Sequence, residues 1–229
     1  MSLITQIGKN IGKRACNKII HNAVYKKALQ EASPLTMDGL ALGDLVHIGN
    51  IVGVLVEQTD KYKKMISFVG NPELWFYQYG YDPYLGEKGT SWNISTNATD
   101  EFNGEKNCNL IFKEECFAKN STSNSDEKRF PLFEKCHELG ENWYIPAIKE
   151  LECLLCNPRL IESIKSYLYR MLFPNFDGDK TYTFWTSTDD IDEYSAMTLS
   201  WNMKTNNIFL REESKSKQLP FFAIYTLYT

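Results

Sequence analysis

Two short tryptophan-containing segments in the last third of the chain constrain its fold more than any other feature. The first is Trp143–Ala147, followed by Glu150 and Leu151, and the second is Phe184–Thr188. A helical pattern lies between them, and strand-like segments follow as far as Phe221–Tyr228. A buried tryptophan contributes about 150–250 Å² of contact area. We therefore expect Trp143 and Trp185 to be buried and to hold helices against a sheet.

Length and composition favour a folded α+β chain. The 229 residues are enough for a core without disulfide staples, and an aromatic content of 14% favours pleated sheets. The net charge of −4 gives no case for a nucleic-acid partner. The charge is uneven, because residues 1–30 hold six cations and no acid, which leaves 19 basic and 29 acidic residues, or −10, in the rest.

The first 30 residues predict a basic amphipathic helix. Isoleucine and alanine recur every three or four positions from Ile4 to Ala23, and Pro34 ends the pattern. We divide the chain into this helix with its linker, residues 1–37, and one domain, residues 38–229. We expect the apolar stripe to dock on the domain or on a second copy in a homo-oligomer. The alternative is contact between residues 4–30 and an anionic membrane, which we favour less because the stripe lacks aromatic anchors.

The sequence shows no motif for membrane insertion, secretion or metal binding, and our predictions of location, metals and cofactors depend on this. No stretch approaches the roughly 20 apolar residues of a membrane span, and lysines interrupt every candidate signal peptide. We therefore expect a protein that is cytoplasmic or carried in a particle, with reduced cysteines. Cys153 and Cys156 have CxxC spacing but no partners for zinc, and the turn at 177–179 lacks the glutamate of a calcium loop. We predict no metal and no cofactor.

The periodicity predicts the elements of the domain. A hairpin should join Leu45–Ile48 to Ile51–Val56 across Gly49-Asn50, and a third strand should follow at 64–69. Residues 81–126 have little periodicity and predict a long loop. The last part predicts helices at 130–139, 146–156 and 160–172, and strands at 197–202, 208–211 and 221–227. In the strand at 197–202, Thr198 and Ser200 alternate with Leu199 and Trp201, which predicts a polar outer face.

One acidic residue and one acidic tract each leave two interpretations open. Glu150, one turn after Pro146, either bonds to backbone or binds a ligand, and we favour the structural role. The acidic tract Asp189, Asp190, Asp192 and Glu193 is either a solvated face or a cation site. We favour the solvated face, because such a tract shows no convergent partners in the sequence.

The order of these motifs resembles bacterial C-type-lectin-like domains. The sequence runs Trp143-Tyr-Ile-Pro-Ala, Glu150-Leu, Trp185-Thr-Ser-Thr, a strand pair and an aromatic closing strand. It is similar to a family of unknown function, common in Bacteroides-like bacteria, with tryptophan-x-leucine-proline, glutamate-leucine and tryptophan-serine-serine-threonine motifs. The same fold branch includes formylglycine-generating enzymes and retroelement-diversified receptor-binding proteins of phages. The resemblance covers residues 140–229 well and 38–229 loosely, with departures at Ile145 and Thr186.

The resemblance implies a C-type-lectin-like α+β fold with small antiparallel sheets, two or three helices and long loops, after the N-terminal helix. It also implies a non-catalytic domain that recognises a protein or glycan through the loop after the second tryptophan and the outward faces of the next strands. In this sequence those positions are Tyr194, Thr198, Ser200, Trp201, Asn202, Lys204, Asn206, Asn207 and Arg211.

Two other functions remain as alternatives. One is a structural subunit of a phage or cell-surface assembly, with the N-terminal helix as its docking element. The other is an enzyme of the formylglycine-generating type, whose chemistry needs a reactive cysteine pair in the C-terminal part. Because no cysteine follows Cys156, we favour a chain that is not an enzyme and has no catalytic residues.

Overall fold

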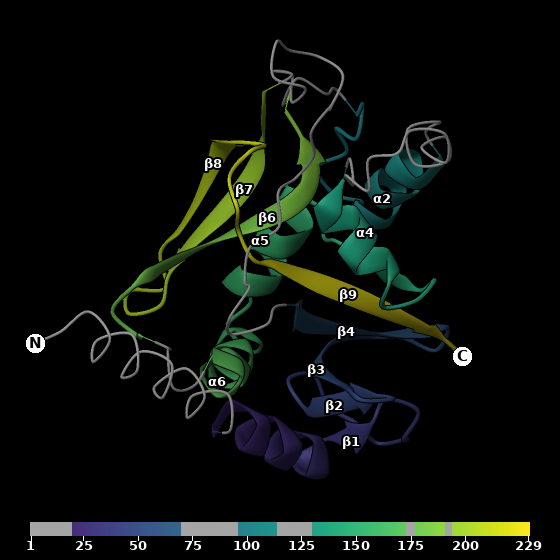
Figure 1. Ribbon diagram of the computed structural model, residues 1–229. Helices are drawn as coiled ribbons and strands as arrows, with labels where there is room; N and C mark the ends of the chain where they lie inside the picture. The colour runs from purple at the N-terminus through teal and green to yellow at the C-terminus, as the bar shows by residue number, and fades with distance from the viewer. Residues whose placement is uncertain (1–19, 70–95, 114–129, 173–176, 191–193) are drawn as a thin grey trace, which may run out of the picture.

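One mixed sheet, with helices packed around it, organises the protein (Figure 1). The computed structural model describes residues 20–69, 96–113, 130–172, 177–190 and 194–229. The strand order is β1-β2-β3-β4-β9-β6-β7-β8, and β5 pairs with β9 off this path. The strands are β1 (Ser33–Pro34), β2 (Leu45–Ile48), β3 (Ile51–Gln58), β4 (Tyr62–Val69), β5 (Trp143–Tyr144), β6 (Thr181–Asp189), β7 (Ser195–Asn202), β8 (Ile208–Ser214) and β9 (Phe221–Tyr228).

The described residues contain five helical segments. They are residues 20–31, α2 (Gly104–Lys113), α4 (Pro131–His137), α5 (Ile148–Cys156) and α6 (Ile161–Leu172). The expected mixture of helices and strands is confirmed. The expectation of small sheets with two or three helices is wrong, because the strands form one nine-stranded sheet and the helices are more numerous.

Strand β9 joins the two parts of the sheet, which are β1 to β4 on one side of it and β6 to β8 on the other. One of its edges pairs with β4 along the whole strand, from Tyr62 opposite Tyr228 to Val69 opposite Phe221. Its other edge pairs with β5 at Ile224 and Tyr225, and then, in parallel, with β6 through Phe221 and Trp185. The aromatic closing strand predicted near residues 221–227 is thus confirmed, and it lies in the interior of the sheet.

The predicted hairpin and third strand are also confirmed. Ile48 lies opposite Ile51 across the Gly49-Asn50 turn, where Gly49 has a φ of 54°, a left-handed conformation that suits glycine. Strand β3 then pairs with β4. At Gly53 a Cβ atom would lie 2.4 Å from the carbonyl oxygen of Ile66, so this position must be glycine for the two strands to approach.

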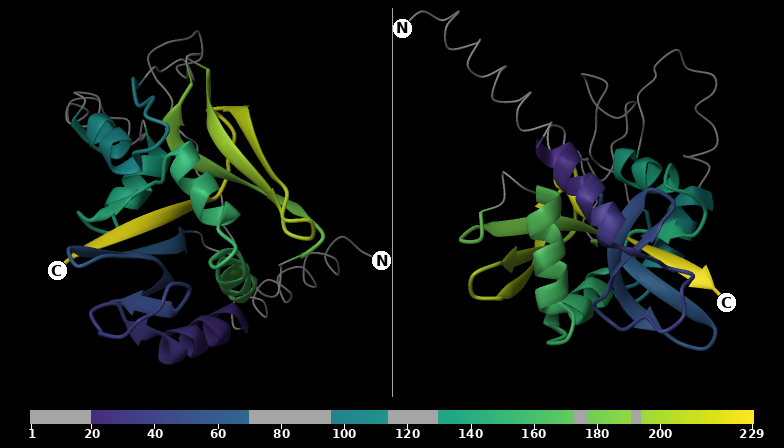
Figure 2. Two further views of the ribbon diagram at one scale, coloured as in Figure 1. Left: turned by 180° about the vertical axis from the view of Figure 1, so that it is seen from behind. Right: turned by 90° about the horizontal axis from the view of Figure 1, so that it is seen from below.

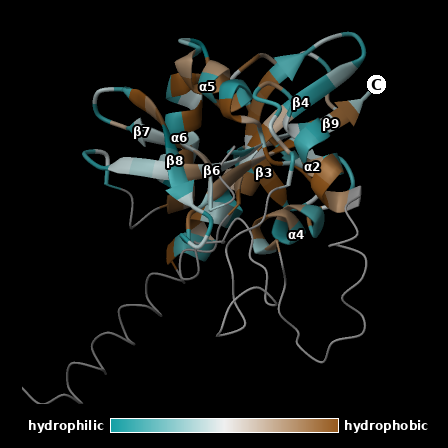
Figure 3. Cartoon of the chain, turned by 90° about the horizontal axis from the view of Figure 1, so that it is seen from above, coloured by the Kyte–Doolittle hydropathy of each residue, from teal (hydrophilic) through white to brown (hydrophobic). Residues whose placement is uncertain are grey.

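Helices α5 and α6 connect the two parts of the sheet, and α2 and α4 pack near β5. Helix α5 contacts β6, β7 and β8, whereas α6 contacts β3 and α5 (Figure 2, left). Helix α2 contacts β5, β6 and α4. The helices predicted near 130–139 and 160–172 are confirmed, but α5 begins at Ile148, two residues after Pro146, because Trp143 and Tyr144 pair with β9 instead. Apolar positions gather where these elements meet (Figure 3).

Both tryptophans of the two sequence motifs are buried, as predicted. Trp185 is 0% exposed and Trp143 is 4% exposed. Phe184, next to Trp185, packs against Phe222 with ring centroids 4.8 Å apart, and Phe68 meets both rings edge-on. The core therefore runs continuously from β4 through β9 to β6.

The N-terminal helix is described only from residue 20, and residues 4–19 lie outside the described part. Residues 20–31 are helical and dock through their own contacts. The Tyr25 hydroxyl donates to the carbonyl oxygen of Asn50, and Glu31 pairs with Arg170 of α6. Leu35, in the segment predicted as linker, is completely buried, and Ser33–Pro34 pairs in parallel with β2. No helix in the described residues is long and apolar enough to cross a membrane.

Candidate functional site

The structure separates the nine predicted ligand-binding residues into a buried group and an exposed group. Thr198, Ser200 and Trp201 are at most 2% exposed. The Thr198 hydroxyl donates to the carbonyl oxygen of Arg211, and the Ser200 hydroxyl lies 2.8 Å from that of Thr183. The predicted polar outer face of this strand is therefore wrong, because Thr198 and Ser200 on one face are as buried as Leu199 and Trp201 on the other.

The exposed group follows the outer strand of the sheet. Strand β8 is the last in the strand order, and we define the β8 strip as Lys204, Asn206, Asn207, Phe209 and Arg211. Phe209 was not among the predicted ligand-binding residues, but its side chain is 45% exposed. The guanidinium of Arg211 lies 5.7 Å from the centre of the Phe209 ring. Tyr194 is exposed as well, but it lies at the opposite end of the hairpin, where its carbonyl oxygen accepts from the Lys215 amide.

Asn202 shapes the turn that leads into the strip. Its side-chain oxygen accepts hydrogen bonds from the backbone amides of Lys204 and Thr205 and from the Thr205 hydroxyl. Asn206 then adopts a φ of 57°, which asparagine tolerates better than most residues. Asn202 is therefore a residue that builds the turn, and the side chains beyond it are the ones presented to solvent.

Glu150 ties four elements together. One carboxylate oxygen accepts from the Tyr144 hydroxyl at 2.7 Å, and the other accepts from the backbone amides of Gly104 and Ala147 at 3.2 and 3.3 Å. The ammonium of Lys64 lies 3.8 Å away on β4. Burial raises the pKa of Glu150, against the lowering effect of these partners. The predicted backbone bonding of Glu150 is confirmed.

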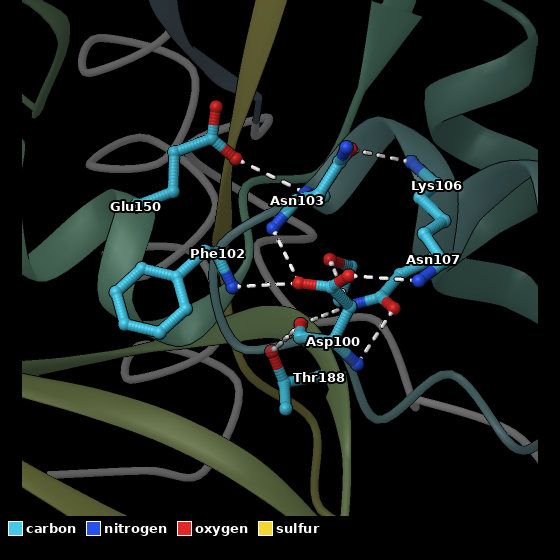
Figure 4. Close-up of polar contacts among 9 residues, drawn as sticks. Asp100, Phe102, Asn103, Lys106, Asn107, Glu150 and Thr188 are labelled. Carbon is cyan, nitrogen blue, oxygen red and sulfur yellow. Dashed lines mark hydrogen bonds and ion pairs between the residues drawn. The ribbon is translucent and has the colours of Figure 1, made fainter.

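The start of α2 is built by a second polar cluster (Figure 4). The Asp100 carboxylate accepts from the amides of Phe102 and Asn103 and from the Lys106 ammonium, all at 3.0 Å, and the amide of Phe102 contributes most to lowering the pKa of Asp100. The buried Asn107 bonds in both directions with the backbone of Asp100. These side chains stabilise the loop before α2 and the first turn of the helix. The prediction that residues 81–126 form one loop is wrong, because α2 lies within that range.

A groove of about 240 Å³ lies beside this cluster and was not predicted from the sequence. It runs between α2, α4 and the end of β9, with Trp143 and Tyr144 of β5 among its lining residues. The buried Cys108 also lines it and bonds through sulfur with the amide of Ile145. Burial raises the pKa of Cys108 to about 12, so the thiol is protonated at neutral pH and poorly suited to act as a nucleophile.

The groove also contains a buried polar atom without a partner. Thr226 lines it and is 3% exposed, and its hydroxyl has no hydrogen-bond partner in the described structure. Tyr144 also lines the groove, and the pKa of Tyr144 is raised first by burial and then by the charge of Glu150. The sequence did not predict this groove, because its lining residues come from four separate segments of the chain.

Asp189, the first residue of the acidic tract, does not belong to the solvated face that we favoured. The side chain of Asp189 is completely buried, and one of its oxygens lies 2.6 Å from the ammonium of Lys215, which is also completely buried. The other oxygen accepts from the amide and hydroxyl of Thr96. Asp190 accepts a hydrogen bond from the Ser195 hydroxyl. Asp192 and Glu193 lie outside the described residues.

The remaining sequence candidates do not assemble into a metal site in the described chain. Cys153 and Cys156 are both exposed on α5. Among residues 20–69, 96–113, 130–172, 177–190 and 194–229, no three His, Cys, Asp or Glu side chains are placed to hold a metal ion together. Comparison of the chain with family models, with curated proteins and with solved structures finds no match in any of the three.

Proposed function

We propose that the protein is a non-catalytic recognition domain of the C-type-lectin-like kind, which binds a protein ligand along the β8 strip. The order of elements supports the fold assignment, since strand β5 with Trp143 is followed by α5, by β6 with Trp185, by the β7–β8 hairpin and by the closing strand β9. Glu150 at the start of α5 supports it as well, because its carboxylate fixes the helix relative to β5 and α2.

The contact between Phe209 and Arg211 is the observation that carries the proposal. Both side chains are exposed on a strand at the edge of the sheet, and within the described residues Arg211 has no ion-pair partner. Aromatic residues and arginine are enriched at protein interfaces and supply most of the residues that dominate binding energy. An edge strand also offers backbone groups to which an extended segment of another protein can pair.

Side-chain contacts within the chain involve the other end of the strip. Asn206 accepts a hydrogen bond from Lys165 of α6, and Lys204 pairs with Asp179. These contacts add to the hydrogen bonds of Asn202 that shape the turn, so the end of the strip that precedes β8 is ordered before a ligand binds. Less entropy is lost when a ligand binds a surface that is already ordered.

The test uses the full chain on peptide and glycan arrays. The variant carries Phe209→Ala and Arg211→Ala, and the matched control carries Tyr169→Ala, which removes an exposed aromatic of α6. We expect peptide signals that survive in the control and fall at least tenfold in the double variant. Signals that are equal in both variants would refute the β8 strip, and signals from glycans alone would refute the protein ligand. Association of the chain with itself, lost in the double variant, would instead favour a structural subunit.

A further inference from the structure

The groove beside β5 has a charge pattern that no part of the proposed function uses. Glu105 and Glu141 stand at its rim, and both are exposed. Neither carboxylate forms an ion pair with a described residue, and no lysine or arginine is among the residues that line the groove. An exposed carboxylate pair without a counter-ion attracts cations, and low-dielectric walls on either side strengthen that attraction.

Aromatic rings supply the walls. Phe112 comes from α2, Tyr144 from β5 and Tyr228 from the end of β9. The face of an aromatic ring carries negative charge from its quadrupole, so an ammonium group placed over it is attracted. The same chemistry already operates at the neighbouring position, where the ammonium of Lys64 lies 5.7 Å from the centre of the Tyr144 ring.

Lys64 does not neutralise the groove. It lies opposite Thr226 on the adjacent strand, but its ammonium is shared between Glu57 at 3.5 Å and Glu150 at 3.8 Å. Two carboxylates therefore compensate this one cation before the rim carboxylates are considered. Burial raises the pKa of Tyr144 most, and the nearby charges of Glu150, Glu105 and Glu57 raise it further, so three carboxylates lie around this wall of the groove.

The unpaired hydroxyl of Thr226 is an independent observation that supports a ligand in this groove. A buried polar group without a hydrogen bond is uncommon, and leaving one unpaired is costly. Thr226 is among the residues that line the groove, and among these lining residues its hydroxyl is the buried side-chain oxygen without a partner in the described structure. Hydroxyl oxygens accept hydrogen bonds, and an ammonium group donates three.

We propose that this groove binds an organic ammonium group, held between Glu105 and Glu141 over the aromatic walls with Thr226 at its floor. The size of the groove, about 240 Å³, falls below the roughly 300–1,000 Å³ of pockets for drug-sized ligands. It therefore suits a short alkylammonium, carried either by a free amine or by the lysine side chain of a peptide. This site is separate from the β8 strip, so each can fail without the other.

The experiment measures binding to the full chain by isothermal titration at low salt with four probes. The free amine is 1,5-diaminopentane, the lysine probe is Nα-acetyl-lysine methylamide, its uncharged counterpart is Nα-acetyl-norleucine methylamide, and the sugar is methyl glucoside. We expect saturable binding of one or both ammonium probes and none of the other two. Preference for the diamine indicates a free amine, whereas preference for the lysine probe indicates a peptide.

Three variants locate the site. Glu105→Gln should weaken ammonium binding about tenfold, the loss expected for one charge-assisted contact. Thr226→Val should weaken it several-fold without lowering the melting temperature, because the hydroxyl bonds to nothing in the described structure. The control Glu212→Gln makes the same charge change on β8. Equal weakening by Glu212→Gln, tight binding of the norleucine or sugar probe, or no saturation by either ammonium probe would overturn the proposal.

Discussion

The ammonium of Lys215 lies 2.6 Å from a carboxylate oxygen of Asp189, and neither side chain is reached by solvent. The pair connects the segment between β8 and β9 to the end of β6. Through Thr96, which donates both its amide and its hydroxyl to Asp189, it also fixes the segment before α2. A buried ion pair is costly to break on one side only, because the remaining charge stays buried without its partner.

Lys215→Met should therefore destabilise the protein by about 3 kcal/mol, at the lower end of the 3–5 kcal/mol typical of such losses. The lower end is expected because Asp189 retains three donors, two from Thr96 and the amide of Asp190. Urea denaturation measures the loss. The matched control is Lys217→Met, whose exposed pair with Glu213 should contribute less than about 1 kcal/mol. Equal effects of the two substitutions would contradict this account.

Trp185→Ala should reduce the free energy of unfolding by about 3–5 kcal/mol, as for other large aromatics removed from a core. Trp185 is completely buried at the single point where β6 meets β9, so the cavity would open at the junction of the two parts of the sheet. Tyr169→Ala, at a half-exposed position on α6, should change stability by less than about 1 kcal/mol. A loss below about 1 kcal/mol for Trp185→Ala, measured in the same denaturant series, would argue against this role.

The sequence predicted elements whose apolar pattern is strong. The β2–β3 hairpin, α6 and β9 were all expected, because periodicity and turn residues agree there. Helix α2 was missed, since its start depends on polar side chains. The side chain of Asn103 accepts from the Lys106 amide, and only Cys108, Ile111 and Phe112 give the helix an apolar face.

The prediction of a polar outer face for β7 was wrong for a different reason. Alternation of threonine and serine with apolar residues is typical of a strand with one wet face, but Thr198 and Ser200 satisfy their hydroxyls within the sheet. The groove could not be predicted either, since Glu105, Glu141 and Thr226 are far apart in the sequence. Their proximity depends on the packing of α2 against β5 and on the pairing of β5 with β9, which a single sequence does not reveal.

Glu150→Gln should lower stability, and the loss should depend on pH. Burial raises the pKa of Glu150 above its ordinary value of 4.5, so the folded state keeps the proton at pH values where the unfolded chain has released it. The wild type then gains stability relative to the glutamine variant as the pH falls through that window. We expect a difference of about 1–3 kcal/mol near pH 4.5 and a smaller one above pH 7.

Chemical denaturation at several pH values measures this dependence. The control is Glu152→Gln, which removes a partly exposed pair with Lys149 and should change stability by less than about 1 kcal/mol at neutral pH. A Glu150→Gln difference that grows as the pH rises would mean that the carboxylate is stabilised in its charged form, contrary to the raised pKa.

The cysteines should fall into two classes of reactivity. Cys108 and Cys136 are buried, and burial raises the pKa of both thiols, that of Cys108 to about 12. Cys153 and Cys156 are exposed. In a chain with Cys16→Ser and Cys116→Ser, a disulfide reagent at pH 8 should label two thiols in the folded protein and four in urea. Rapid labelling of all four without urea would show that the groove side of α2 opens.

The position of β9 determines when the fold can be completed. The strands before it form two groups, β1 to β4 and β6 to β8, and the joining strand follows both in the chain. During synthesis the pairing partners of β4 and β5 on β9 are made last, so those strand edges remain open until residues 221–228 emerge. Such non-local pairing folds slowly and exposes edges to other chains. The sheet therefore becomes continuous only when its last strand in the chain has paired with β4, β5 and β6.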